Sequence, residues 1–242
     1  MRVAFVQSAP SLSRRNYSDI VNQVKSHIGR ADLILFPELA MNGYMLQDKL
    51  YEDAYTLEEL EELKELSWEI DIALGIALKD KKVFRNAALY YSKGELIYQH
   101  NKVELPNYGM FEEARYFSAG DSFRSFHTSH AKIALLVCED LWSAKLHYQL
   151  HQEDPDVIIV LAASPARGFE DDKLLIEDQW YSLLKSAALQ CDAKVLFINR
   201  VGFEDGLGFW GGSCVISEDA RVVHKMAKFD ERIEIFEIEG LR

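Results

Sequence analysis

The chain has 242 residues, of which 48% are hydrophobic and 27% are charged. This is the composition of an ordinary globular protein, and it excludes a disordered tail, a collagen-like fibre and a disulfide-stapled miniprotein. The 39 acidic and 27 basic side chains give a formal net charge of −12. A surface this acidic repels phosphate backbones, so we expect no nucleic-acid partner. The default explanation of the acidity is solubility.

The sequence carries no recognisable signal for export or for membrane insertion. Its amino terminus lacks a long apolar stretch with a cleavage site, so no signal peptide is expected. The longest apolar runs, such as 157–163, fall far short of the ~20 residues that a membrane helix needs. The three cysteines, Cys138, Cys191 and Cys214, cannot all pair and are widely spaced. We therefore predict a cytoplasmic protein with reduced thiols.

Short apolar runs alternate with longer amphipathic stretches along the chain. The short runs predict strands at 3–7, 33–36, 72–78, 87–91, 96–99, 133–137, 157–161, 195–198, 213–216, 222–224 and 233–238. Helical spacing of apolar residues predicts helices at 18–30, 57–70, 141–150 and 174–190. The turn signal Ser92-Lys93-Gly94 joins two of the strands as a hairpin. The glycine-rich segment 206–212 lacks the Lys-Ser/Thr end of a phosphate loop and is predicted to be a loop.

The predicted elements indicate an α/β fold. About eleven strands are more than one doubly wound sheet usually holds, so we expect two mixed sheets packed face to face with helices outside each. The hairpins argue against a purely parallel sheet. No linker, low-complexity segment or internal repeat divides the chain. We therefore predict a single domain over residues 1–242.

Three reactive side chains directly follow predicted strands, where ligands sit in open α/β sheets. They are Glu38, Lys102 and Cys138, and together they supply a carboxylate, an ammonium and a thiol for nucleophilic chemistry. Taken singly, each has an ordinary interpretation, as a turn carboxylate, a surface lysine and a buried cysteine. Their joint occurrence favours an active site. Cys191 and Cys214 lack such surroundings and are predicted to be structural.

The same positions resemble the motifs of a known family. Phe36-Pro37-Glu38 followed by Gly43-Tyr44, then Lys102, then Cys138-Glu139-Asp140 resemble the three motifs of the nitrilase superfamily of carbon–nitrogen hydrolases. The resemblance runs from Val3 to about Ile238. The segments 105–109, 113–117, 138–142 and 163–165 are similar to the glutaminase domains of glutamine-dependent NAD synthetases.

The resemblance implies a four-layer α-β-β-α sandwich and assigns roles to the reactive residues. Glu38 would take the proton of the Cys138 thiol, and the thiolate would attack an amide or nitrile carbon. Lys102 would hold the oxyanion with the backbone N–H after Cys138, and its charge would lower the pKa of the thiol. Glu113 matches a second family glutamate, either positioning the lysine and substrate or only pairing with Lys102. No cofactor is implied.

Five further positions match pocket residues of the glutaminase branch: Tyr44, Tyr108, Glu139, Trp142 and Ser164. Glu139 stands beside the nucleophile and could receive a substrate ammonium. Tyr44 and Trp142 could equally be aromatic core. Arg167 has two interpretations, a contact to a substrate carboxylate or a surface loop arginine.

A metal site is not expected. His147 and His151 are spaced four apart on a predicted helix, a spacing that can bind zinc, but Tyr148 stands where a metalloprotease has glutamate. No third ligand is evident in the sequence. Both histidines are therefore predicted to be exposed to solvent.

Four functions follow from these observations. The first is an amidase that acts on a small amide, and the second is a glutaminase subunit whose ammonia passes to a separate synthetase partner. The third is a nitrilase, and the fourth is a silent relative that only binds a partner or metabolite. No adenylate-binding segment is evident, so we expect that this chain cannot make NAD alone. The resemblance also implies a homodimer or higher homo-oligomer.

Overall fold

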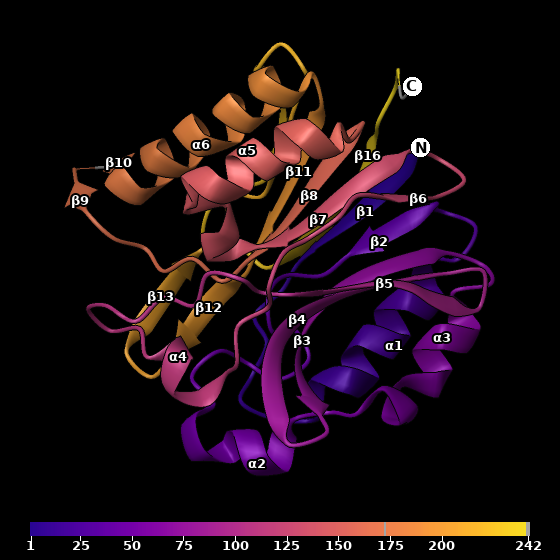
Figure 1. Ribbon diagram of the computed structural model, residues 1–242, viewed down its shortest axis with the longest axis vertical. Coiled ribbons are helices and arrows are strands. Elements are labelled where there is room, and N and C mark those ends of the chain that lie inside the picture. The colour runs from indigo at the N-terminus through magenta and orange to yellow at the C-terminus, as the bar shows by residue number, and fades with distance from the viewer. Residues whose placement is uncertain (172, 241–242) are drawn as a thin grey trace.

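The computed structural model describes residues 1–171 and 173–240, and it contains two six-stranded mixed sheets packed face to face (Figure 1). The first sheet has the strand order β16-β1-β2-β3-β4-β5. Its strands are β1 (Arg2–Gln7), β2 (Leu33–Leu35), β3 (Asp71–Asp80), β4 (Val83–Ser92), β5 (Glu95–Asn101) and β16 (Arg232–Glu237). β1, β2 and β3 are parallel, and β16, β4 and β5 join by antiparallel pairing.

The second sheet has the order β15-β14-β11-β8-β7-β6, with β7, β8 and β11 parallel. Its strands are β6 (Phe126–His127), β7 (Lys132–Val137), β8 (Val157–Ala162), β11 (Lys194–Asn199), β14 (Cys214–Ile216) and β15 (Val222–Lys225). Two small hairpins lie outside the sheets: β9 (Phe169–Glu170) with β10 (Lys173–Leu174), and β12 (Val201–Glu204) with β13 (Leu207–Trp210).

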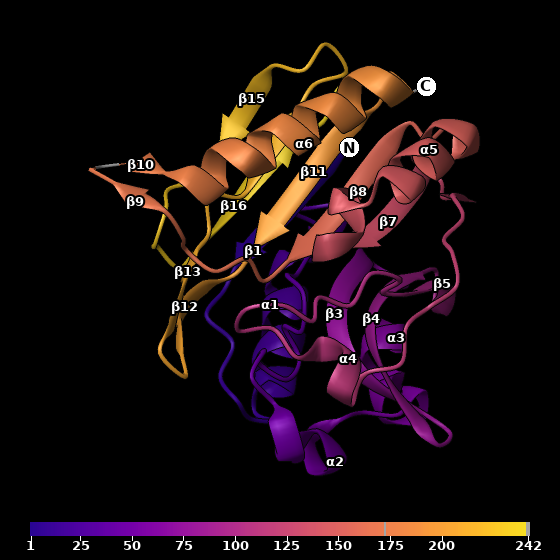
Figure 2. The ribbon, with the colours of Figure 1, turned by 60° about the vertical axis from the view of Figure 1, so that its left-hand side comes forward.

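Helices cover the outer faces of both sheets (Figures 1 and 2). The helices are α1 (Asn16–His27), α2 (Leu50–Asp53), α3 (Glu61–Leu66), α4 (Glu113–Tyr116), α5 (Ala144–Glu153) and α6 (Leu175–Cys191), with 3-10 turns at Gln47–Lys49, Leu57–Leu60 and Cys138–Trp142. Side chains of α1 and α3 pack on one face of the first sheet, and side chains of α5 and α6 pack on one face of the second.

The core between the sheets is formed by alternate residues of the facing strands. Phe5, Leu35 and Ala73 of the first sheet meet Leu135 and Ile159 of the second, and all five are fully buried. The outer faces carry the other residues of each strand, which explains why these runs are continuously apolar. The predicted α/β class and the four-layer sandwich are confirmed.

Each predicted strand is present, with ends shifted by a few residues. The helix predicted at 57–70 begins as a 3-10 turn and ends at Leu66, and the helix predicted at 141–150 starts at Ala144 because residues 138–142 form a 3-10 turn. The loop predicted for 206–212 is wrong in part: 207–210 form strand β13, whose residues pair with β12. Phe209 and Trp210, at the end of this strand, are fully buried.

The long helix α6 packs its apolar side onto its own sheet. Trp180, Leu184 and Ala188 are buried against the second sheet. The helix therefore covers its own sheet. Within residues 1–171 and 173–240, no helix has the length and apolar character required to cross a lipid bilayer.

Candidate active site

The site lies where the carboxyl ends of strands from both sheets meet. Glu38 comes three residues after β2, Lys102 directly after β5, and Cys138 directly after β7. β5 runs in the same direction as β2 and β3, because two antiparallel pairings separate it from β3. All three side chains thus follow strand ends, as the sequence predicted, and the structure places them at one end of the sandwich.

A glycine allows the segment that carries Glu38 to pass close to the sheet. The segment passes so close to Gly75 of β3 that a Cβ added to this glycine would lie 2.5 Å from Glu38 Cα, from Leu39 N and from Pro37 O. Leu39 adopts a φ of +50°, which turns the chain away after Glu38. The carboxylate of Glu38 is completely buried.

Replacing Gly75 with alanine should therefore displace Glu38. The three atoms that the new methyl group meets belong to the backbone, so they have little freedom to move away. We expect ammonia release to fall about 100-fold, because displacements of about 1 Å can have effects of this size. Gly29→Ala is the control for a general loss of stability: its φ of +76° strains any side chain there, but no atom lies within 4 Å of the added methyl group, so Glu38 is not displaced. Equal activity in both variants would contradict this account.

One ammonium joins the two predicted glutamates. Lys102 Nζ donates to Glu38 Oε1 and to Glu113 Oε1, each at 2.8 Å, and the lysine is 1% exposed. Backbone N–H of Ala163, just after β8, donates to the second oxygen of Glu38 at 2.8 Å. Glu38, Lys102 and Glu113 therefore form one buried cluster.

Asn86 is a member of this cluster that sequence reasoning missed. Its side-chain nitrogen donates to Glu38 Oε1 at 2.8 Å and to Glu113 Oε2 at 3.3 Å, and its backbone carbonyl accepts from the backbone N–H of Lys102. Asn86 lies near the start of β4, just before the predicted strand 87–91. A buried polar residue beside an apolar strand is the one signal that could have indicated it.

Cys138 sits at a sharp turn between β7 and the following 3-10 turn. Its φ of +45° is in the left-handed region, which is uncommon for a side chain with a Cβ. Asp140 fixes this turn, because its carboxylate accepts from the backbone N–H groups of Val137, Val103 and Glu104. It also meets His100 Nε2 at 2.6 Å. Asp140 therefore ties the cysteine turn to the chain just after Lys102.

The charges of the cluster act on the thiol in opposite directions. Burial and the carboxylate of Glu38 raise the pKa of Cys138 well above its ordinary value, while Lys102 lowers it. The expectation that Lys102 would lower the thiol pKa holds for its own contribution, but the net direction is upward. At neutral pH the thiol is therefore protonated at rest.

The same balance keeps the lysine charged. Burial alone lowers the pKa of Lys102, but Glu113 and Glu38 raise it well above its ordinary value. Burial raises the pKa of Glu113, and Lys102 opposes this. Tyr44 donates its hydroxyl to Glu113 Oε1 at 2.5 Å, and burial raises the pKa of this phenol.

A small cavity of about 20 Å³ opens at the thiol. It is lined by Tyr44, Cys138, Glu139, Trp142, Ser164 and Arg167, among others. Four of the five residues predicted to bind substrate thus line the same cavity as Cys138. Tyr108, the fifth, is half exposed and donates its hydroxyl to Glu139 at 2.8 Å. Burial and this hydrogen bond raise the pKa of Tyr108 to about 12.

Ser164 and Arg167 present different chemistry to the cavity. Ser164 Oγ accepts from the indole nitrogens of Trp180 and Trp210, at 2.8 and 3.2 Å, so its hydroxyl can act toward a ligand only as a donor. Arg167 lies over the ring of Phe111, and its buried Nε has no hydrogen-bond partner among the described residues.

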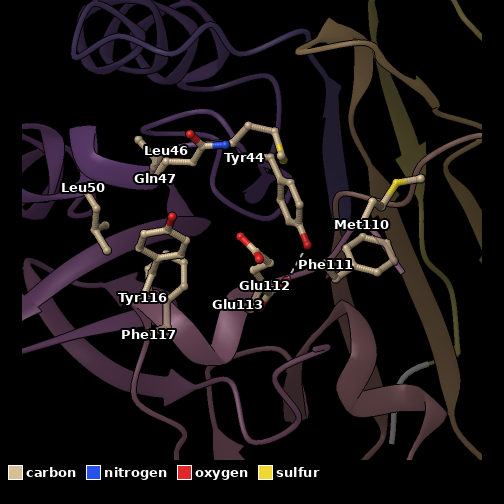
Figure 3. A pocket seen from close by; sticks show the side chains of 11 residues that line it. Tyr44, Leu46, Gln47, Leu50, Met110, Phe111, Glu112, Glu113, Tyr116 and Phe117 are labelled. Atoms are coloured by element: carbon tan, nitrogen blue, oxygen red, sulfur yellow. Dashed lines mark hydrogen bonds between the residues drawn. The ribbon is translucent and has the colours of Figure 1, made fainter. Parts of the chain in front are cut away.

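A second cavity, about 50 Å³, lies behind the aromatic wall (Figure 3). Tyr44 and Phe111 line both cavities, and Leu46, Leu50 and Phe117 line only the second. Figure 3 shows the Tyr44 hydroxyl pointing toward Glu113. Tyr44 is therefore both a core residue and a wall of the site.

The two histidines spaced four apart hydrogen-bond to the backbone. His147 Nε2 meets Leu141 O at 2.7 Å, and His151 Nδ1 meets Gln190 O at 2.8 Å. Across the described part of the chain, no group of three or more His, Cys, Asp or Glu side chains is arranged to hold a metal ion. Cys191 and Cys214 are buried away from the cluster.

Comparison with known proteins gives a consistent result over nearly the whole chain. The chain is 30% identical over 250 residues to the glutamine-dependent NAD(+) synthetase of Acinetobacter baylyi, which covers 100% of this chain and 45% of that protein. The solved glutamine-dependent NAD+ synthetase of Acinetobacter baumannii superposes with a TM-score of 0.82 at 28% identity, over 97% of this chain and 44% of that one. The chain thus spans less than half the length of these relatives.

A shorter protein shares the fold. The carbon–nitrogen hydrolase of Helicobacter pylori superposes with a TM-score of 0.85 at 21% identity, over 96% of this chain and 87% of that one. The model of the carbon–nitrogen hydrolase family matches residues 2–240. With the buried glutamate–lysine–glutamate cluster beside the turn of Cys138, this match shows that the chain belongs to the carbon–nitrogen hydrolase family.

Proposed function

We propose that the protein is a cysteine-dependent hydrolase that cleaves the carbon–nitrogen bond of a small amide and releases ammonia. The observation that carries this proposal is the sharing of one buried ammonium by two carboxylates beside the Cys138 turn. Burying two carboxylates and an ammonium is costly for a fold, and such clusters are a mark of functional sites.

Glu38 is the general base in this proposal. It takes the proton from the Cys138 thiol as the sulfur attacks the amide carbonyl carbon, forming a C–S bond and a tetrahedral oxyanion. The oxyanion collapses, the C–N bond breaks, and the proton on Glu38 goes to the departing nitrogen, so ammonia leaves and a thioester remains. Glu38 then takes a proton from water, whose oxygen attacks the thioester. The acid forms, and the thiol recovers its proton.

Lys102 supplies positive charge rather than a proton-accepting group. Because its pKa is raised well above the ordinary value, it stays an ammonium at neutral pH. One of its N–H groups is available to the oxyanion while two hold Glu38 and Glu113. Glu113 keeps the lysine in place.

The cavity favours an amide that carries both an ammonium and a carboxylate. Glu139 presents a carboxylate beside the nucleophile, and Arg167 presents an unpartnered guanidinium Nε. An amino acid with an amide side chain, such as glutamine, matches these two charges. The cavity is too small for such a molecule as it stands, so side chains around Glu139 must move to admit it. Tyr108, which is half exposed and bonds to Glu139, is the side chain that we expect to move.

A substrate panel tests the proposal. Glutamine, asparagine, simple aliphatic amides and nitriles are incubated with the protein, and released ammonia is measured before and after treatment with iodoacetamide. We expect release from at least one amide, ended by the thiol reagent. Release of ammonia only from nitriles would favour a nitrilase, and no release from any compound would reject the free-standing amidase.

Glu139→Gln separates substrates by their charge. We expect KM for glutamine to rise roughly tenfold, because a charge-assisted hydrogen bond to the substrate ammonium is lost. An aliphatic amide without an amino group is the matched control. Its KM should change by no more than a factor of two to three, because Glu139 makes no specific contact with such a substrate. Equal effects on both substrates would remove Glu139 from amine recognition.

A second candidate is a glutaminase subunit that passes ammonia to a separate synthetase. The similarity to glutamine-dependent NAD synthetases, of which this chain spans less than half, favours it. Affinity purification from the native host should then retain an ATP-dependent synthetase, and glutamine hydrolysis should increase when that partner is added. Full activity of the isolated chain, unchanged by a lysate, would favour the free-standing amidase.

A further inference from the structure

The hairpin of β12 and β13 reaches the site from outside the two main sheets. Figure 2 shows it projecting beyond the end of β11. Glu204, the last residue of β12, is 8% exposed. Its Oε1 accepts from the backbone N–H groups of Tyr44, at 2.8 Å, and of Met45. One carboxylate oxygen therefore holds two successive amides of the loop that carries Tyr44.

The other oxygen of Glu204 is fixed by a buried arginine. Arg200 Nη1 donates to Glu204 Oε2 at 3.0 Å, and Nη2 donates to Pro10 O at 2.9 Å. The guanidinium also lies 4.1 Å from the centroid of the Phe209 ring on β13. Phe209 in turn packs edge-on against the ring of Tyr44, with centroids 5.9 Å apart. The hairpin thus contacts both the backbone and the ring of Tyr44.

The approach of the loop to Glu204 requires a glycine before Tyr44. Gly43 has a φ of +82°, and a Cβ there would lie 2.9 Å from Glu204 Oε2 and 2.8 Å from Ser11 O. The loop is therefore seated against the hairpin with no room for a side chain. The close contacts of Gly43 with Glu204 and Ser11 fix the direction of the ring of the next residue, Tyr44.

Tyr44 connects the hairpin to the glutamate–lysine cluster. Its hydroxyl donates to Glu113 Oε1, the same oxygen that accepts from Lys102. We propose that Glu204 is a positioning residue of the hydrolase, which holds Tyr44 so that its hydroxyl keeps Glu113 paired with Lys102. This inference rests on the proposed function, and it gives a role to the glycine-rich segment and to the buried Arg200–Glu204 pair.

The inference predicts a change in pH dependence. Glu113 faces Lys102, Glu38 and Tyr44, and it accepts a further hydrogen bond from Asn86. Burial raises its pKa, whereas Lys102 and the Tyr44 hydroxyl lower it by favouring the carboxylate. When Tyr44 is displaced, the pKa of Glu113 rises further. Glu113 then takes up a proton at a higher pH, and the acid limb of kcat/KM moves upward.

A double-mutant cycle tests the coupling. Glu204→Gln and Tyr44→Phe should each lower kcat roughly tenfold and move the acid limb upward by about half to one pH unit. If Glu204 acts through the Tyr44 hydroxyl, Glu204→Gln should have no further effect once Tyr44 is phenylalanine. Losses that multiply, or an acid limb that does not move, would overturn the inference.

Two further variants distinguish the proposed effect on Tyr44 from a general loss of folding. Glu177→Gln is the matched control, because Glu177 is 7% exposed, close to the 8% of Glu204, and accepts from Lys225 and Lys228 rather than from the loop of Tyr44. Its pH profile should match that of the wild type. If Glu204→Gln does not fold, Phe209→Leu keeps the Arg200–Glu204 pair and releases the ring of Tyr44. It should move the acid limb in the same direction, and an unmoved limb would count against the inference.

Amide hydrogen exchange separates this inference from the proposed function. In the wild type, the backbone N–H groups of Tyr44 and Met45 should exchange slowly, and Glu204→Gln should speed their exchange at least roughly tenfold. Unchanged exchange would overturn the inference whatever the activity. Faster exchange in a protein that hydrolyses no amide would instead reject the proposed function, and the catalytic part of the inference with it.

Discussion

Replacing Cys138 with alanine should reduce ammonia release by roughly 10⁴–10⁶-fold, the range seen when a catalytic nucleophile is removed. Without the sulfur no thioester forms, and neither Glu38 nor Lys102 can substitute for it. Cys191→Ala and Cys214→Ala are the matched controls, because both thiols are buried in the core of the second sheet. They should retain wild-type activity. The measurement is initial-rate ammonia release at saturating amide.

The chemistry of the thiol provides an independent check on the same prediction. Burial raises the pKa of Cys191 to about 11 and that of Cys214 to about 12, and Cys138 is also raised, mainly by burial and by Glu38. Cys138 is the least buried of the three. Iodoacetamide should therefore modify Cys138 first, and the rate should keep rising above the pH at which an ordinary thiol is fully ionised. Full activity of Cys138→Ala would exclude the thioester route.

Patterns within short segments were enough to predict the layers and three of the site residues. Strands buried on both faces are continuously apolar, so they are visible in the sequence, and their carboxyl ends mark where Glu38, Lys102 and Cys138 must emerge. The helices were visible from their single apolar stripe. Glu113 came only from the family resemblance, because no periodicity distinguishes it from Glu112 beside it.

Residues whose role depends on pairing between distant strands could not be predicted. Asn86 reaches both carboxylates only because β4 starts at the edge where β2 and β5 end. Asp140 and His100 meet across 40 residues of sequence. Strand β13 lies in the glycine-rich segment that was predicted as a loop, and β12, which carries Glu204, was not predicted at all. The direction of the Cys138 pKa also needed the fold, because it is the sum of burial and opposing charges.

Replacing Lys102 with methionine should have the second largest effect, on both activity and stability. Methionine fills a similar volume but leaves Glu38 and Glu113 buried without their shared cation. We expect the free energy of unfolding to fall by about 3–5 kcal/mol at neutral pH, as when one partner of a buried ion pair is removed. Ammonia release should fall roughly 10³-fold, because an oxyanion donor is lost.

The loss of stability in Lys102→Met should depend on pH in a defined direction. Burial already raises the pKa of Glu113 above that of the unfolded chain, and removing the ammonium raises it further. Between the unfolded and folded pKa values, the folded state binds more protons, so its stability increases as the pH falls. Urea unfolding at pH 8 and pH 5.5 measures the free energy of unfolding of the variant and of the wild type. The difference between the two should be smaller at pH 5.5. Lys194→Met is the control, since Lys194 pairs with Glu218 at the surface. Its free energy of unfolding should differ from that of the wild type by the same amount at both pH values. A difference for Lys102→Met that is larger at pH 5.5 would mean that the two carboxylates are not held as a charged pair by Lys102.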